Sequence, residues 1–367
     1  QELFDIVLKE NASDLIISAG APPILRINGQ LYRTKTDPLT PQATEKIIYS
    51  FLTKEQKEQF EKEKELDFSL AVGRKHRFRV NVYYQKQCVT AALRPIPEKI
   101  PSLKDLGLPE NLRELAFARQ GLVLVTGPTG SGKTTTLASL IDIINNQRAC
   151  HIITIEDPIE YVHTHKKSIV DQREIGGDTH NFVRALKYVL RQAPDVILIG
   201  EMRDLETIEA AITAAETGHI VFSTLHTTGA SRTVDRIVNI FSVAQQEQIR
   251  MMLSVSILAV ISQVLLNRID KKGKVAAFEV MLVTTSIQNL IRERKTYRIL
   301  SEIQTGGKMG MVPLDASLIK LFKEGKISLE DVLTYAYDPQ STQTELIAQG
   351  LIDETGEMKK KENELKK

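Results

Sequence analysis

Residues 121–134 read Gly-Leu-Val-Leu-Val-Thr-Gly-Pro-Thr-Gly-Ser-Gly-Lys-Thr, an apolar run that leads into the pattern G-x-x-x-x-G-K-T. The run 122–125 predicts a buried strand, and residues 135–145 continue at helical spacing. A glycine-rich loop between a strand and a helix is the context in which this pattern binds phosphate, because its backbone N–H groups point at one anion. The alternative is a glycine-rich turn before an ordinary helix, which leaves the Lys-Thr pair unexplained. The stretch therefore predicts an α/β fold that binds a nucleotide.

This loop is expected to hold both ATP and a metal ion. Lys133 is expected to meet the β- and γ-phosphates, which also makes it a catalytic candidate, and the Thr134 hydroxyl is expected to bind Mg²⁺. The expected nucleotide-binding residues of the loop are Gly127, Pro128, Thr129, Gly130, Ser131, Gly132, Lys133, Thr134 and Thr135.

Composition limits the class of protein. The length of 367 residues suggests about two domains. With 48 basic and 46 acidic residues the net charge is +2, so no overall field favours nucleic acid or an anionic membrane. Two cysteines, Cys88 and Cys150, offer neither a disulfide framework nor a four-cysteine zinc site, which favours a reducing cytosol. The longest apolar stretch, 251–266, contains serines and a glutamine, so we expect a buried helix there and no membrane insertion.

Residues 1–97 have the pattern of a small α+β domain. Asn28-Gly29 is a strong hairpin signal, because both turn positions need a positive φ. Three later segments alternate apolar and polar residues as antiparallel strands do, at 67–72, 77–85 and 88–94. Prolines then mark a linker, which we place at residues 98–104.

Strands and helices alternate from residue 105 to residue 336. This alternation predicts a mostly parallel sheet with helices on both faces. The expected strands lie at 122–125, 151–155, 196–199 and 220–224. Helices are expected to dominate after Ala230. Residues 337–367 form a charged tail that we expect to be partly disordered.

Acidic residues follow two of these strands. Glu160 comes shortly after the strand at 151–155, and Glu201 follows the strand at 196–199. Gly200 occupies the position where a Walker B strand usually carries Asp. Because ligands of open α/β sheets lie beyond the carboxyl ends of strands, both acids are expected near the phosphates. Glu201 is the expected Mg²⁺ ligand, through water, and either acid is a candidate to activate the attacking water. The alternative for each is a helix N-cap or a surface charge.

Two histidines bracket the strand at 220–224. His226 follows its carboxyl end and is a catalytic candidate that senses the γ-phosphate, whereas His219 precedes the strand and is a candidate nucleotide contact. An ordinary hydrogen-bonded polar role remains open for both.

The stretches around Lys133, Glu160, Glu201 and His226 together resemble the Walker A, Asp box, Walker B and His box of the secretion-superfamily traffic ATPases, the PilT/PilB/GspE family. Within it, the likeness to the type IV pilus retraction ATPases covers residues 2–335. It includes the runs Ala12-Ser13-Asp14-Leu15, Gly20-Ala21-Pro22-Pro23, Arg77-Phe78-Arg79-Val80-Asn81 and Gly200-Glu201-Met202-Arg203-Asp204-Leu205-Glu206-Thr207. The resemblance implies a PAS-like N-terminal α+β domain, a RecA-like P-loop ATPase domain and a hexameric ring, with nucleotide between the domains and near the neighbouring subunit.

The resemblance also implies roles for particular residues. Arg77, Arg79 and Arg94 match the arginines of the N-terminal domain that act as arginine fingers in this family. Ordinary strand-surface charges are the alternative. Glu160 matches the water-activating base and Glu201 the Walker B acid near Mg²⁺, although the two roles could be shared or exchanged.

As a function, the resemblance implies a Mg²⁺-dependent ATPase that drives pilus retraction and twitching motility. The implied partners are further copies of the chain in a homohexamer, an inner-membrane pilus platform protein and a second retraction ATPase, with no nucleic acid. The implied location is the cytoplasm, with recruitment to the cytoplasmic face of the inner membrane at the pilus base.

Four other functions remain open. Gln288 stands where the retraction ATPases carry an arginine, which leaves room for a PilU-like accessory retraction ATPase, although such chains usually lack the run 201–207. Pilus-extension and type II secretion ATPases are a second alternative. They usually carry a four-cysteine zinc module as well as a longer N-terminal region, and a chain with only Cys88 and Cys150 argues against them. A nucleic-acid translocase should show a basic, aromatic groove, yet this chain has balanced charge and no Trp. A nucleotide-sensing scaffold would not need Glu160 and Glu201.

Overall fold

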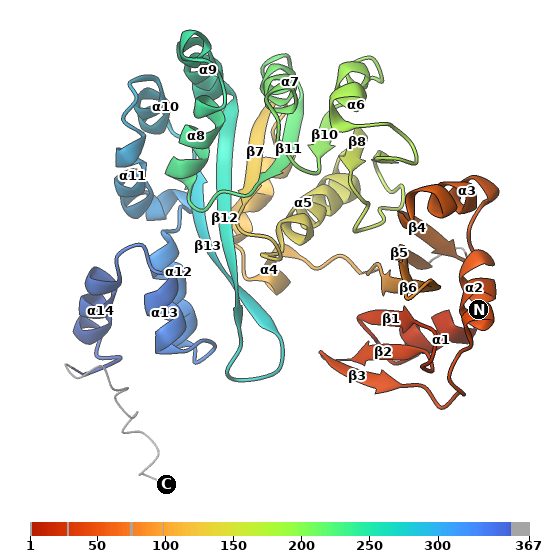
Figure 1. The fold of residues 1–367 in the computed structure, drawn as a ribbon. Helices are drawn as coiled ribbons and strands as arrows, with labels where there is room; N and C mark the ends of the chain where they lie inside the picture. The colour runs from red at the N-terminus through yellow and green to blue at the C-terminus, as the bar shows by residue number, and fades with distance from the viewer. Residues whose placement is uncertain (1, 28, 74–75, 98, 354–367) are drawn as a thin grey trace. The chain divides into compact units, whose positions relative to one another are not determined.

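The computed structural model describes residues 2–27, 29–73, 76–97 and 99–353 (Figure 1). Contacts within the chain divide it into two compact units. The first contains the residues up to 100 together with 157–163 and 172–178, and the second contains the others. The segment around Glu160 thus groups with the N-terminal unit. The domain limits expected at residues 97 and 105 stay a prediction.

The first unit is built on a six-stranded sheet in the order β3-β2-β1-β6-β5-β4, with antiparallel pairing throughout. Its strands are β1 Asp14–Ile17, β2 Ile24–Ile27, β3 Gln30–Arg33, β4 Glu65–Val72, β5 His76–Gln85 and β6 Cys88–Pro95. Its helices are α1 Glu2–Lys9, α2 Pro41–Tyr49 and α3 Lys54–Glu63. The β2–β3 hairpin turns at Gly29, whose φ is +83°, while Asn28 of the predicted turn lies outside the described residues. Phe60 and Phe78 are fully buried in the core of this unit.

The second unit contains a seven-stranded sheet in the order β13-β12-β7-β11-β10-β8-β9. Its strands are β7 Gly121–Thr126, β8 His151–Glu156, β9 Ile169–Glu174, β10 Val196–Ile199, β11 Ile220–Leu225, β12 Ile257–Asn267 and β13 Lys274–Leu282. Residues 172–174, at the end of β9, group with the first unit by their contacts. Five neighbouring strands run parallel, in the spatial order β12, β7, β11, β10 and β8. The strand β13 pairs antiparallel with β12. Every residue of β7, β10 and β11 is buried, as expected where helices cover both faces of a parallel sheet.

Helices and short 3₁₀ turns make up most of the rest of the second unit. The helices are α4 Leu103–Leu106, α5 Lys133–Gln147, α6 Phe182–Val189, α7 Leu205–Glu216, α8 Ala230–Asn239, α9 Val243–Ser256, α10 Thr285–Arg292, α11 Ile299–Thr305, α12 Leu314–Lys323, α13 Leu329–Tyr335 and α14 Pro339–Ala348. The 3₁₀ turns are η1 Glu110–Phe117, η2 Thr296–Arg298 and η3 Gly306–Met309. The predicted class, an N-terminal α+β domain followed by an α/β domain with a mostly parallel sheet, is confirmed.

One segment that the sequence assigned to a buried helix is mostly a strand. The helix α9 ends at Ser256, and residues 257–267 form β12, which pairs with β7 and with β13 in the long hairpin seen in Figure 1. A continuous apolar run does not distinguish a helix from a strand that is buried on both faces. The β-branched residues Val260, Ile261 and Val264 favour the strand. The expectation that helices dominate after Ala230 is therefore wrong for the hairpin.

The start of the predicted tail is folded. Residues 339–348 form α14, which begins at the Asp338 N-cap. Leu346 and Ile352 are fully buried in a cluster with α12 and α13, so the expected disorder is wrong for this part. The rest of the predicted tail, 354–367, lies outside the described residues. Within the part of the chain that the structure describes, no helix has the length and apolarity that crossing a bilayer requires.

Candidate nucleotide site

The phosphate loop joins the end of β7 to the start of α5. Gly127, Gly130 and Gly132 have φ values of +140°, +77° and +86°, which side chains other than glycine rarely allow. A Cβ at Gly127 would overlap the main-chain carbonyl oxygen of Gln263 on β12 and lie 2.7 Å from Ser131 Oγ. Gly127 is therefore required by close packing as well as by its backbone conformation.

The residues of the loop fit a phosphate group. The N-cap residue of α5 is Gly132, which has no side chain that could bond to the first N–H groups of the helix. A Cβ at Gly130 would meet no atom within 4 Å, which shows open space beside the loop. Ser131 is 2% exposed, and its Oγ has no hydrogen-bond partner among the described residues. Oriented N–H groups at a helix N-terminus beside open space suit an anion.

Lys133 is held against the loop. Its ammonium group donates to the carbonyl oxygens of Gly127 at 3.0 Å and Pro128 at 3.1 Å. The charge therefore lies beside the positions expected to contact phosphate. Thr134 and Thr135 follow in the first turn of α5 and are half-buried. Pro128, Thr129 and Gly130 are exposed at the tip of the loop.

Glu201 and His226 lie at the same sheet edge as the loop. In the parallel pairing of β11 with β7, Leu225 is opposite Thr126, the last residue before the loop. The carboxylate of Glu201 is 2.7 Å from Arg203 Nε and 3.4 Å from His226 Nε2. A β11 hydroxyl, that of Thr224, donates to the carbonyl of Gly200 at 2.7 Å and so holds the end of β10. The structure thus brings Glu201 and His226 together at the carboxyl ends of β10 and β11.

The oxygen donors of this edge suit Mg²⁺. The Thr134 hydroxyl and the Glu201 carboxylate are hard ligands of the kind that Mg²⁺ takes together with water and phosphate oxygens. No three His, Cys, Asp or Glu side chains within the described ranges could hold a metal by themselves. Such a sparse set is compatible with Mg²⁺, which keeps several waters and binds through substrate phosphates.

The structure places His219 at the other end of β11. The residue directly precedes Ile220, which is opposite Gly121 at the start of β7. Its Nδ1 lies 3.1 Å from the carbonyl oxygen of Ala214. Within one chain, His219 therefore does not share an edge with the phosphate loop, and its nucleotide contact stays a prediction that this placement does not support.

Three arginines lie on one face of the first unit's sheet. Arg77 and Arg79 are two residues apart on β5, and Arg79 is opposite Arg94 on β6. Arg94 donates to Asp14 Oδ1 through Nε at 2.9 Å and Nη2 at 2.7 Å, and Arg79 lies 3.7 Å from Asp67. These two pairs border a hollow of about 240 Å³. The predicted arginine fingers are therefore grouped, and two of them have carboxylate partners.

Glu160 belongs to the first unit and lies outside helices and strands. Its side chain is exposed. The neighbouring backbone is held, since Ile159 N–H donates to Glu174 Oε2 at 3.1 Å, and Ser69 Oγ donates to the same oxygen at 2.7 Å. Its predicted role as a base stays a prediction.

Two residues that contact the site were not predicted from the sequence. One contacts Glu201 and the other contacts the phosphate loop. Arg203 pairs with Glu201, and it lies in the same run of sequence. Gln263 donates through Nε2 to the carbonyl oxygen of Ser131 at 2.5 Å and is 2% exposed. A glutamine inside an apolar run was the available signal, because buried amides need partners.

Comparison with known protein families identifies the family of this chain. Residues 1–312 match the family described as type II/IV secretion system protein. The chain belongs to this family. It is 48% identical to the type IV pilus retraction ATPase PilT of Pseudomonas aeruginosa, over 93% of this chain and 98% of that protein. It is 39% identical to the type IV pilus ATPase PilU of the same organism, over 92% of this chain and 88% of that protein.

A solved structure of a relative supports the same family assignment. The crystal structure of the pilus retraction motor PilT with bound ADP matches with a TM-score of 0.87 and 49% identity, covering 93% of this chain and 97% of that one. The predicted resemblance to the traffic ATPases, and among them to the pilus retraction ATPases, is therefore confirmed. The chain is an ATPase of this family. The roles of individual site residues stay predictions.

Gly127→Ala is expected to weaken ADP binding about 100-fold, comparable to losing one or two hydrogen bonds to a charged group. The added Cβ would force the loop away from Gln263. Isothermal titration measures the change, with Gly176→Ala as the matched control. Gly176 also has a positive φ, +87°, but a Cβ there would meet no atom within 4 Å. Equal effects of the two substitutions would contradict the packing argument.

Proposed function

We propose that this chain is the subunit of a homohexameric motor that couples ATP hydrolysis to type IV pilus retraction and disassembly, and so to twitching motility. The observation that carries the proposal is the phosphate loop at one sheet edge with Glu201 and His226, in a chain that is similar to PilT over nearly its whole length. The proposed substrate is ATP with Mg²⁺.

In this proposal the loop binds the phosphates. The N–H groups of residues 127–135 and the Lys133 ammonium would surround the β- and γ-phosphates. The Thr134 hydroxyl and, through water, Glu201 would hold Mg²⁺, which when bound neutralises charge that develops on the phosphates. Arg203 is 72% exposed, so its ion pair with Glu201 contributes about 1 kcal/mol or less. Glu201 can therefore change partners at little cost.

Water activation and charge stabilisation complete the proposed mechanism. Glu160 is the proposed base that takes the proton of the attacking water, with Glu201 able to share the task. His226 senses the γ-phosphate from the end of β11. Arg77, Arg79 and Arg94 are the proposed fingers, of the same or a neighbouring subunit. Because Arg79 and Arg94 are 47% and 68% exposed, their pairs with Asp67 and Asp14 are weak enough to exchange for phosphate oxygens.

The proposed setting is the cytoplasmic face of the inner membrane at the pilus base. There the ring would act on a pilus platform protein in the inner membrane, together with a second retraction ATPase. Two relatives are type IV pilus ATPases, which supports the pilus as the setting, and the membrane face and the partners follow from the family resemblance.

The second candidate is a PilU-like accessory retraction ATPase. Gln288, in place of an arginine, is half-buried on α10, beside the fully buried Ile287. The higher identity to PilT than to PilU, 48% against 39%, favours the first candidate. Pilus extension, type II secretion and nucleic-acid translocation are less well supported.

Deletion of the gene in the source cell is expected to leave abundant pili that do not retract. Retraction removes pilin from the filament base, so its loss should spare assembly. Electron microscopy counts the pili, and tethered-bead pulling measures retraction. Bald cells would point to extension, and normal retraction would point to an accessory role.

Lys133→Ala and Glu201→Ala are each expected to lower ATP turnover of the purified protein at least about 100-fold, because each removes a charge that acts on the phosphates. Phosphate release measures turnover. Lys308→Ala, at an exposed lysine of η3, is the control and should retain activity. Unchanged turnover in Lys133→Ala and Glu201→Ala would overturn the site assignment.

Arg79→Ala and Arg77→Ala are expected to depress kcat at least about tenfold while nucleotide affinity changes less than about twofold, since a finger acts mainly in the transition state. Steady-state kinetics and ADP titration separate the two effects. Arg33→Ala, on an exposed position of β3, is the control. A loss of affinity with kcat preserved would count against the finger role.

A further inference from the structure

The apolar strand β12 carries two adjacent polar side chains that the proposed mechanism does not use. Ser262 is 6% exposed and Gln263 is 2% exposed. In the pairing of β12 with β7, Ser262 is opposite Thr126, the residue that precedes the phosphate loop. Because successive side chains of a strand point to opposite faces, the two serve different sides of the sheet.

Gln263 holds the phosphate loop on one side. Its Nε2 donates to the carbonyl oxygen of Ser131 at 2.5 Å, and its Oε1 accepts from Thr136 Oγ1 at 2.9 Å. These two bonds join the loop and the first turn of α5 to a third element, β12. The main-chain carbonyl of the same residue also packs against Gly127. A single β12 residue thus contacts both ends of the loop.

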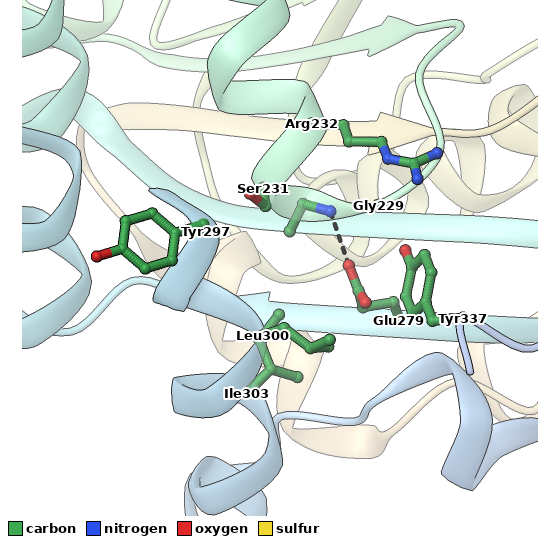
Figure 2. A pocket seen from close by; sticks show the side chains of 9 residues that line it. Gly229, Ser231, Arg232, Glu279, Tyr297, Leu300, Ile303 and Tyr337 are labelled. Atoms are coloured by element: carbon green, nitrogen blue, oxygen red, sulfur yellow. Dashed lines mark hydrogen bonds between the residues drawn. The ribbon is translucent and has the colours of Figure 1, made fainter. Parts of the chain in front are cut away.

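Ser262 holds a second segment on the other side. Its Oγ accepts from Gly229 N–H at 2.9 Å. Its cross-strand partner on β13, Glu279, accepts from Ala230 N–H at 2.7 Å. Figure 2 shows this bond from the start of α8 to the Glu279 carboxylate. Two consecutive N–H groups, three and four residues after His226, are therefore fixed by one pair of opposed residues.

The Glu279 carboxylate that accepts from Ala230 N–H is enclosed by its surroundings. The side chain is 2% exposed and lies beside the Tyr337 ring at the edge of a cavity of about 280 Å³ (Figure 2). Burial raises the pKa of the Glu279 carboxyl, while hydrogen bonds from Ala230 and Tyr337 oppose that rise. A Cβ at Gly229 would overlap the Tyr337 hydroxyl, so the backbone approaches closely here as well.

We propose that Ser262, Gln263 and Glu279 are positioning residues of the nucleotide site. Gln263 would fix the phosphate loop, and Ser262 with Glu279 would fix the segment that carries His226, so that the β12–β13 hairpin sets the position of one relative to the other. The inference rests on the proposed ATPase site and adds residues that would act on it through the phosphate loop and the His226 segment.

The two sides of the hairpin should have separable effects. Gln263→Met keeps the side-chain size and loses both hydrogen bonds, so ADP affinity is expected to fall about tenfold. Ser262→Ala and Glu279→Leu are expected to lower kcat about tenfold with ADP affinity within about twofold, because they act on the His226 segment. Glu279→Gln keeps an acceptor oxygen for Ala230 N–H, so its kcat is expected to stay close to that of the wild type.

Ser256→Ala is the matched control for Ser262→Ala. Ser256 is also buried, at 3% exposed, and its hydroxyl donates to the Met252 carbonyl at 2.9 Å, away from both segments. Thermal unfolding identifies variants that fail to fold. If Glu279→Leu fails to fold, the kcat of Ser262→Ala alone tests whether the hairpin acts on the His226 segment.

The proposal is overturned if Gln263→Met leaves ADP affinity unchanged, or if Ser262→Ala changes kcat no more than Ser256→Ala does. It is also overturned if Glu279→Gln fails to restore what Glu279→Leu loses in folded protein. ADP titration needs no hydrolysis. A wild-type protein that binds ADP without turnover would defeat the proposed function, while the Gln263 comparison would still decide the inference.

Discussion

The close packing of Gly127 against the main chain of Gln263 is the constraint on which the site depends. It places the first residue of the phosphate loop directly on β12, a strand that lies 130 residues further along the chain. That contact and the Gln263 side-chain bonds to Ser131 and Thr136 hold the end of β7 and the start of α5 against one strand. Preorganisation of this kind lets a loop bind an anion without ordering itself first.

The sequence predicted what lies in contiguous residues and missed what depends on distant contacts. The loop from Gly127 to Thr134 was found because its chemistry and its strand–loop–helix context are local. Gln263 was missed because its partners Ser131 and Thr136 are more than a hundred residues away. Likewise, the pairing of Arg94 with Asp14 joins residues 80 apart, and no local pattern indicates it. The fold class followed from periodicity, which failed at β12 because that strand is buried on both faces.

The polar side chains of the proposed mechanism and of its supporting residues are of two kinds, which differ in burial. Arg79, Arg94 and Arg203 are exposed and paired loosely enough to change partners. Gln263 and Glu279 are almost fully buried, and breaking their hydrogen bonds would leave polar atoms without water. The first kind suits groups that must move during a catalytic cycle, and the second suits groups that must not.

The strand β13 also connects to the C-terminal helices. Phe278 N–H donates to Ser317 Oγ of α12 at 3.0 Å, and Ala277 belongs to the buried cluster that α12, α13 and α14 share. Phe278 and Glu279 are consecutive, so the residue that fixes the start of α8 adjoins the residue bonded to α12. A displacement of α12 would act on β13 directly beside Glu279. If Glu279 positions the His226 segment as proposed, load on the C-terminal helices would reach the nucleotide site through Phe278, and the rate of hydrolysis would respond to it.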